Sequence, residues 1–218
     1  KPTIMKTSIT KIIVLFFSFS TMATAIAGAE KNIEFEDWQL TVNDDNGAVT
    51  LYRGDMPLLN RSIARWSGNE DDTLSLADCG KLNVRIADGT GMLGKQKTVI
   101  ISGKKGGTTA TQRINFYPGK EFVTTELEIA NPTGLESRFM APVYVTENCD
   151  VFDRTGNSIV FVPYDNDAWV RYSLTPFGRP APESYEVTAI VNADTREGIV
   201  VGSVEHDTWK TGIKVAAD

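Results

Sequence analysis

The chain has 218 residues, of which 22 are Lys or Arg and 28 are Asp or Glu, so its formal net charge is -6. Hydrophobic residues make up 41% and charged residues 23%. This composition is that of an ordinary globular protein, and it argues against a disordered tail, a coiled coil or a collagen-like repeat. Because phosphate binding needs a basic surface, the acidic balance also argues against nucleic acid as a partner.

The first 29 residues form a basic, apolar leader. They contain three lysines and no acidic residue, and an apolar block, IIVLFFSF, runs from Ile12 to Phe19. The TMATAIAGA that follows offers several A-x-A cleavage sites. These features predict a secretory signal peptide in residues 1–27, cut after Ala27. The apolar block is shorter than the roughly 20 residues of a membrane span, so we prefer this interpretation to an uncleaved anchor or a core strand.

Cleavage would leave one exported domain, residues 28–218, in the periplasm or outside the cell and without a membrane partner. Met5, not Lys1, begins the leader, and the last residues, GIKVAAD, show no terminating feature. We therefore expect the chain to be part of a longer reading frame.

From residue 31 onward, apolar and polar residues alternate between turn signals, which predicts a series of β-strands. The expected strands are 34–42, 49–52, 58–66, 82–87, 97–102, 111–117, 122–130, 139–146, 158–162, 168–173, 185–191 and 198–204. Asn46-Gly47 predicts a hairpin, because both residues tolerate the positive φ of primed turns. Gly89–Gly91 is read as a turn. No long amphipathic segment separates the strands, so parallel βαβ units are not expected.

The predicted fold is therefore all-β, with two large antiparallel sheets stacked as a single-domain sandwich. In 122–130, Val123 and alternate residues after it form an apolar face, whereas Thr124, Glu126 and Glu128 form the opposite, polar face.

Two cysteines lie 70 residues apart. In an exported domain, Cys79 and Cys149 could form a disulfide that stabilises the fold by roughly 4 kcal/mol. Two separate buried thiols are the alternative, and the sequence favours neither. No CxxC motif is present, so neither a redox motif nor a structural zinc site is expected.

Several enzyme classes lack their usual residues here. His206 is the one histidine in the chain, so a hydrolase triad or a histidine-rich metal site would have to be built around it. No G-x-S-x-G elbow, P-loop or dinucleotide fingerprint is present. We predict no catalytic residue in this chain, no metal ligand and no cofactor.

The segment VPYDNDAWVRY, residues 162–172, is the most unusual part of the sequence. Asp165 and Asp167 could accept hydrogen bonds from sugar hydroxyls, and Tyr164 and Trp169 could stack on a sugar face. A calcium site would need six to eight oxygen ligands, more than this short cluster supplies. The alternative is a polar turn between two strands with Trp169 in the core.

A second segment, GSVEHDTWKTG, spans residues 202–212. Glu205 and Asp207 would share a face of a strand, where they could act as an acid/base pair. We favour a strand that ends in a polar turn, and keep the segment as an interdomain or ligand surface. Tyr117, Phe122 and Tyr144 are interpreted as core or sheet-face aromatics.

Three segments resemble the N-terminal region of exported bacterial alpha-galactosidase-like enzymes of the glycoside hydrolase family 36 kind. They are YPGKEFVTTELEIANPTG (117–134), FVPYDNDAWVRY (161–172) and SYEVTAIVNADTREGIVVGSVEHDTWKTGI (184–213). The resemblance implies a supersandwich fold, related to galactose mutarotase, placed before a (β/α)8 barrel. The barrel supplies both catalytic aspartates of a retaining mechanism, so no catalytic residue carries over to this chain. A loop of the sandwich would reach the rim of the active site, and Asp165, Asp167 and Trp169 are its candidate carbohydrate-binding residues.

The function implied is that of a non-catalytic sandwich domain, whose partners are the catalytic barrel of the same polypeptide and a galactoside-like carbohydrate. A freestanding carbohydrate-binding module is the alternative, and a structural sandwich without a ligand is the third hypothesis. The fold relationship also suggests a mutarotase. The mutarotase reaction resembles proton transfer at a sugar's anomeric hydroxyl by a Glu and a His with help from a second His, and this chain has only one histidine.

Overall fold

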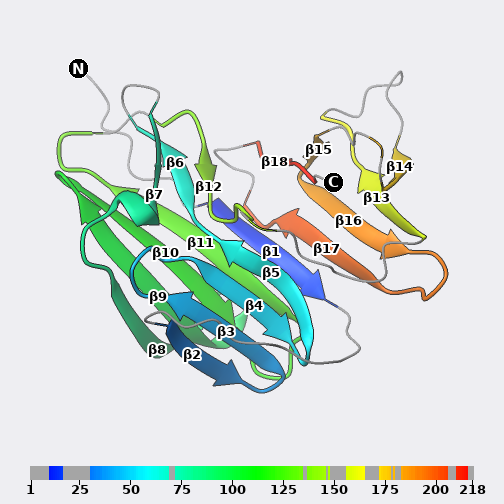
Figure 1. Ribbon diagram of the computed structural model, residues 1–218, viewed down its shortest axis with the longest axis horizontal. Helices are drawn as coiled ribbons and strands as arrows, with labels where there is room; N and C mark the ends of the chain where they lie inside the picture. The colour runs from blue at the N-terminus through cyan, green and yellow to red at the C-terminus, as the bar shows by residue number, and fades with distance from the viewer. Residues whose placement is uncertain are drawn as a thin grey trace.

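The computed structural model describes residues 10–16, 30–68, 72–134, 137–145, 147, 156–164, 172–177, 179, 183–205 and 210–215, and for residues 10–16 it describes the backbone only (Figure 1). These residues form antiparallel β-sheets with one short 3₁₀ turn, Leu76–Asp78. The predicted all-β, antiparallel sandwich is therefore confirmed.

The largest sheet has nine strands in the order β14-β13-β16-β17-β1-β11-β10-β9-β8, and every neighbouring pair is antiparallel. Its strands are β1 (Thr10–Phe16), β8 (Asn83–Gly91), β9 (Gly94–Lys105), β10 (Thr108–Phe116), β11 (Phe122–Ala130), β13 (Asn157–Phe161), β14 (Ser173–Pro176), β16 (Val187–Asn192) and β17 (Gly198–Ser203).

Three smaller sheets complete the fold. A four-stranded sheet has the order β2-β3-β4-β5, a three-stranded sheet the order β12-β6-β7, and β15 pairs with β18. Their strands are β2 (Glu30–Phe35), β3 (Trp38–Asn43), β4 (Val49–Arg53), β5 (Met56–Ser62), β6 (Arg65–Ser67), β7 (Thr73–Ser75), β12 (Met140–Ala141), β15 (Ser184–Tyr185) and β18 (Gly212–Ile213).

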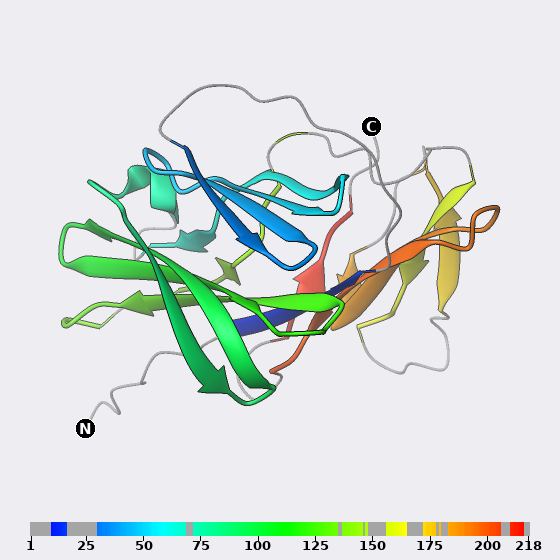
Figure 2. The same cartoon turned by 90° about the horizontal axis from the view of Figure 1, so that it is seen from below.

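The main core lies between the four-stranded sheet and one face of β9–β11 (Figure 2). Alternation along each strand places its apolar residues on this inner face. Its largest fully buried side chains include Trp38, Trp66, Phe116 and Leu127. Phe116 packs against Trp38 across the two layers, with ring centroids 6.3 Å apart. We call the opposite side of β9–β11 the outer face.

Three predicted strands are each divided in the structure, and one of them, 185–191, is divided at Glu186 between β15 and β16. The expected strand 34–42 is a hairpin of β2 and β3, because the chain reverses at Glu36-Asp37 and pairs Phe35 with Trp38. Glu36 adopts a left-handed φ of 52°. The expected strand 58–66 is broken after Ser62, and its two parts, β5 and β6, belong to different sheets.

The turn expected at Gly89–Gly91 is wrong. β8 continues to Gly91, which pairs with Gly94, so Met92 and Leu93 form the hairpin loop. The predicted hairpin at Asn46-Gly47 is confirmed between β3 and β4. Among these two residues, only Gly47 has a positive φ, 73°, because this is a longer loop closed by hydrogen bonds to the Asn43 and Asn46 side chains.

Part of the predicted signal peptide forms a strand in the structure. β1 lies between β11 and β17, with Val14 opposite Val123 on one side and Val201 on the other. The backbone of residues 10–16 thus occupies a position inside the large sheet (Figure 1). Removal of residues 1–27 on export stays a prediction, and it would take this strand away.

Cys79 is a free, buried thiol. It follows the 3₁₀ turn, packs in the main core, and donates to the backbone oxygen of Ser75 over 3.8 Å. Burial raises the pKa of the thiol, and the nearby Asp78 carboxylate adds to this effect. The structure thus has Cys79 as one of the separate buried thiols that the sequence allowed, and Cys149 lies outside the described residues.

Candidate functional site

The predicted carbohydrate-binding residues Asp165, Asp167 and Trp169 lie outside the described residues. The structure does describe both flanks of their segment. Tyr164 follows β13 and Tyr172 precedes β14, and these two tyrosines have 59% and 63% of their surface exposed. Since β13 pairs with β14, the segment that carries the three residues connects neighbouring strands.

Four stretches of the chain meet beside Tyr164. The amide of Tyr185 donates to the carbonyl of Val162 over 3.0 Å. The amide of Glu186 donates to the carbonyl of Thr211 over 2.9 Å, and the Glu186 carbonyl accepts from the amide of Ser203 over 2.8 Å. We call the surface formed by residues 162–164, 183–187, 203–205 and 210–214 the junction surface.

Glu186 joins these stretches through an unusual backbone conformation. Its φ is 65°, in the left-handed region that residues other than glycine seldom adopt. The conformation divides the chain between β15 and β16, so that Glu186 contacts both the end of β17 and the stretch before β18. Backbone strain of this kind persists only where the surroundings impose it, which indicates a defined local structure.

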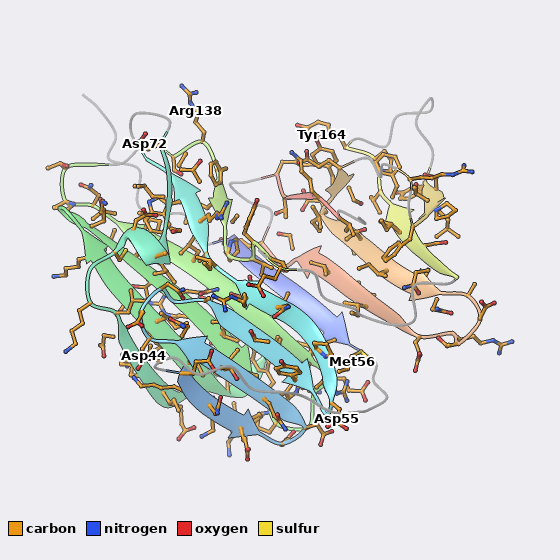
Figure 3. The ribbon with its side chains drawn as sticks, in the orientation of Figure 1. Asp44, Asp55, Met56, Asp72, Arg138 and Tyr164 are labelled. Carbon is orange, nitrogen blue, oxygen red and sulfur yellow. The ribbon has the colours of Figure 1, made fainter. Side chains whose placement is uncertain are left out.

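Aromatic and charged side chains contact one another on the junction surface. The Tyr164 and Tyr185 rings meet edge to face, with centroids 4.8 Å apart. The Lys210 ammonium lies 5.1 Å from the Tyr164 ring centroid and 3.6 Å from a Glu186 carboxylate oxygen. Figure 3 shows Tyr164 beside β15, far from Asp44 and Asp55 of the four-stranded sheet. An exposed ring held by a cation–π contact and an edge-to-face partner suits a ligand or another domain.

The second predicted segment contributes only in part. Glu205 is described, and its carbonyl accepts a hydrogen bond from the Ser203 hydroxyl over 3.0 Å. His206, Asp207 and Trp209 lie outside the described residues, so the suggested pair of Glu205 and Asp207 stays a prediction.

Sequence reasoning missed a second polar site, on the outer face of the large sheet. Asn115 is only 1% exposed there, although it belongs to the face away from the main core. It lies between Thr98 and Thr124 in register, and these two hydroxyls are also buried. The alternation predicted that Thr124 belongs to a polar face, but it did not predict that this row of polar side chains is buried.

Asn115 forms four hydrogen bonds, the number that one side-chain amide can make. Its Oδ1 accepts from the Thr98 hydroxyl over 2.7 Å and from Gln96 Nε2 over 3.2 Å. Its Nδ2 donates to the Thr124 hydroxyl and to Glu126 Oε1, both over 3.0 Å. The amide therefore links β10 to side chains on both neighbouring strands, β9 and β11.

Tyr117 extends this network. Its hydroxyl lies 2.9 Å from that of Thr124, and burial raises the pKa of the phenol. The expectation that Tyr117 is a core or sheet-face aromatic is confirmed, because the residue is 4% exposed and its ring packs against Phe122 at 5.3 Å.

A cavity of about 230 Å³ opens over this network. It is lined by Gly91, Met92, Leu93, Gln96, Arg113, Tyr117, Thr124, Glu126 and Val204. Arg113 stands opposite Glu126 in register and forms a 2.8 Å ion pair with Glu128. The cavity thus combines a phenol, an amide, a hydroxyl, a guanidinium and a carboxylate, which can donate and accept hydrogen bonds.

In the described part of the chain, no group of three or more His, Cys, Asp or Glu side chains is arranged to hold a metal ion. No helix among these residues is long and apolar enough to cross a membrane. Comparison of the chain with protein families, with curated proteins and with solved structures found no match.

Proposed function

We infer that the chain is the N-terminal, non-catalytic sandwich domain of an exported alpha-galactosidase-like glycoside hydrolase. In this function it supports a (β/α)8 catalytic barrel of the same polypeptide and lines one side of the barrel's carbohydrate cleft with Asp165, Asp167 and Trp169. The proposal rests on the resemblance of residues 117–134, 161–172 and 184–213 to such enzymes.

One structural observation supports it most directly. Val162 and Thr211, from the resembling segments 161–172 and 184–213, are 49 residues apart (211 − 162). Backbone hydrogen bonds from Tyr185 and Glu186 nevertheless join both of them into the junction surface. The exposed Tyr164, which ends the described flank before the Asp165–Trp169 segment, belongs to the same surface. A domain that contributes a loop to a neighbouring active site needs a rigid base of this kind, because rigid elements position functional groups better than loops do.

The test uses the polypeptide encoded by the complete reading frame and a chromogenic aryl α-galactoside. We expect hydrolysis, and we expect Asp165→Asn, Asp167→Asn and Trp169→Ala each to lower kcat/KM by about tenfold or more, with Tm preserved. Asp45→Asn, in an exposed loop of the β3–β4 hairpin, is the matched control and should leave kcat/KM unchanged. A reading frame without a barrel, or a polypeptide that hydrolyses no α-galactoside, would refute the proposal.

A freestanding carbohydrate-binding module is the second candidate. The exposure of Tyr164 and Tyr172 on either side of the Asp165–Trp169 segment favours it, because binding modules present exposed aromatic rings to sugars. It predicts that the 218-residue chain binds galactosides in calorimetry and loses this binding in Trp169→Ala. A sandwich without a ligand would bind none, and the same substitution would alter only its stability.

A further inference from the structure

We propose that the cavity on the outer face of the large sheet binds one ring of a neutral, polyhydroxylated ligand, such as a monosaccharide unit. This site is formed by the β8–β9 hairpin together with β10 and β11, and none of the predicted site residues belongs to it. It goes beyond the function proposed above and does not depend on a catalytic barrel.

The size of the cavity limits the ligand to a small one. Its volume of about 230 Å³ is below the roughly 300–1,000 Å³ of sites for drug-sized molecules. A single sugar or cyclitol ring is of suitable size, whereas a longer oligosaccharide would have to extend into solvent.

The polar groups of the cavity are held in place before a ligand arrives. Asn115 lies beneath them and bonds to Gln96, Thr124 and Glu126, three of the lining residues. Tyr117 is held by the Thr124 hydroxyl. Since the side chains are already ordered by buried partners, binding costs little rotamer entropy. This is an arrangement expected of a binding site rather than of a merely solvated strand face.

The charges of the cavity favour a neutral ligand over an anion. Arg113 is the one basic residue among the lining side chains described, and its guanidinium is already paired with Glu128. Glu126 adds a second carboxylate, so the described charged groups at the cavity sum to a negative charge. Hydroxyl groups both donate and accept hydrogen bonds, and they therefore match a mixture of carboxylate, amide and phenol better than a phosphate or a sulfate does.

The hairpin loop supplies an apolar wall. Met92 is 82% exposed and Leu93 is 40% exposed, and Val204 lines the cavity with them. A sugar ring has an apolar C–H face as well as hydroxyl groups, so it could cover part of this surface. Gly91 matters as well, because a Cβ at this position would clash with Gln96 Oε1. The absent side chain leaves room for Gln96 to stay beside the cavity.

The test is a titration of the ¹⁵N-labelled full chain with D-galactose, D-glucose and myo-inositol, and with sodium sulfate as the anionic probe. We expect millimolar affinity for at least one of the neutral ring compounds. The amide resonances of Gly91, Gln96 and Thr124 should shift, whereas those of Tyr164 and Tyr185 should not.

Variants then assign the binding to the cavity. Glu126→Gln keeps the shape and an oxygen for Asn115 but removes the charge, and it should weaken binding about tenfold. Gly91→Ala should weaken it as well, because the added methyl displaces Gln96. Ser102→Ala, on the same face of β9 but outside the cavity lining, is the matched control and should bind as the unmodified chain does. Thermal unfolding of each variant confirms that it is folded.

Three results would overturn the proposal. In the first, the chain is folded but none of the neutral ring compounds changes its spectrum. In the second, the resonance shifts are confined to the junction surface. In the third, sulfate shifts the cavity resonances as much as the sugars do, or more. Equal weakening by Ser102→Ala and Glu126→Gln would also contradict it. None of these results depends on whether the longer polypeptide hydrolyses a galactoside, so the two proposals fail separately.

Discussion

Replacement of Asn115 by alanine tests whether the outer-face network stabilises the fold. The side chain is 1% exposed and makes four hydrogen bonds, to Gln96, Thr98, Thr124 and Glu126. Each such bond contributes roughly 0.5–1.5 kcal/mol net. The variant therefore loses the sum of four such contributions, reduced where water reaches the partners that are not fully buried.

We expect Asn115→Ala to lower the free energy of unfolding by about 2–4 kcal/mol. Neither threonine loses all its partners, since Thr124 keeps the Tyr117 hydroxyl and Thr98 keeps Gln96 Nε2. For a chain of this size the loss corresponds to a fall in Tm of roughly 4–16 °C, at about 2–4 °C per kcal/mol.

Urea unfolding followed by tryptophan fluorescence measures this loss, with Ser102→Ala as the control on the same face. The midpoint should fall while the slope with urea stays the same, because the surface exposed on unfolding hardly changes. A loss below about 1 kcal/mol would show that water replaces the amide without penalty, and that the network is not a stabilising element.

Further predictions concern neighbouring residues. Thr125 has a buried hydroxyl on the inner face with no hydrogen-bond partner among the described residues, so Thr125→Val should raise the unfolding free energy by about 1 kcal/mol. Thr124→Val should lower it. Urea unfolding of the two variants would contradict us if both free energies changed in the same direction. Gly47→Ala should lower the free energy of unfolding by more than about 1 kcal/mol, because φ is +73° and the new Cβ would lie 2.9 Å from Leu76 Cβ. Gly54→Ala should lower it less, because Gly54 has φ +55° but open space around the new Cβ. Equal Tm values for the two variants would refute this. Because burial raises the Tyr117 pKa, the folded chain holds the phenol proton more tightly than the unfolded chain. The stability that this proton contributes is complete below the unfolded pKa near 10 and is lost as pH rises through the folded pKa. Above about pH 10, Tm should therefore fall more steeply with pH in the unmodified chain than in Tyr117→Phe.

The sequence predicts the strands best where alternation is long. The prediction for 122–130 matches β11 from end to end, because its apolar residues at every second position fix the face that meets the core. The turn at Glu36-Asp37 could not be predicted in this way. Asp37 is a common turn residue, but Glu36 is not, and its left-handed φ accompanies the pairing of β2 with β3. Met92-Leu93 is a similar case, with apolar residues in a hairpin loop.

The candidate sites were predicted less well than the strands, for a physical reason. Alternation shows that Thr124 and Glu126 share a face, but it does not show which side chains from other strands cover that face. Burial of Thr98, Asn115 and Thr124 depends on three strands standing in register, and this is a tertiary property. The junction surface was anticipated only in part. Residues 162–164 and 203–205 belong to the two segments that the sequence singled out, whereas the contribution of 183–187 depends on tertiary backbone hydrogen bonds.

The position of β1 has a consequence for the order of events in the cell. Its seven residues belong to the stretch that an export machinery would recognise and a peptidase would remove, and in the structure they also link β11 to β17. One molecule cannot use them for both purposes at once. If the leader is cut, β11 and β17 begin about two strand spacings apart, roughly 10 Å, and the sheet is completed only after export. Removal of the leader would then be the step that allows β11 and β17 to become neighbours in the sheet.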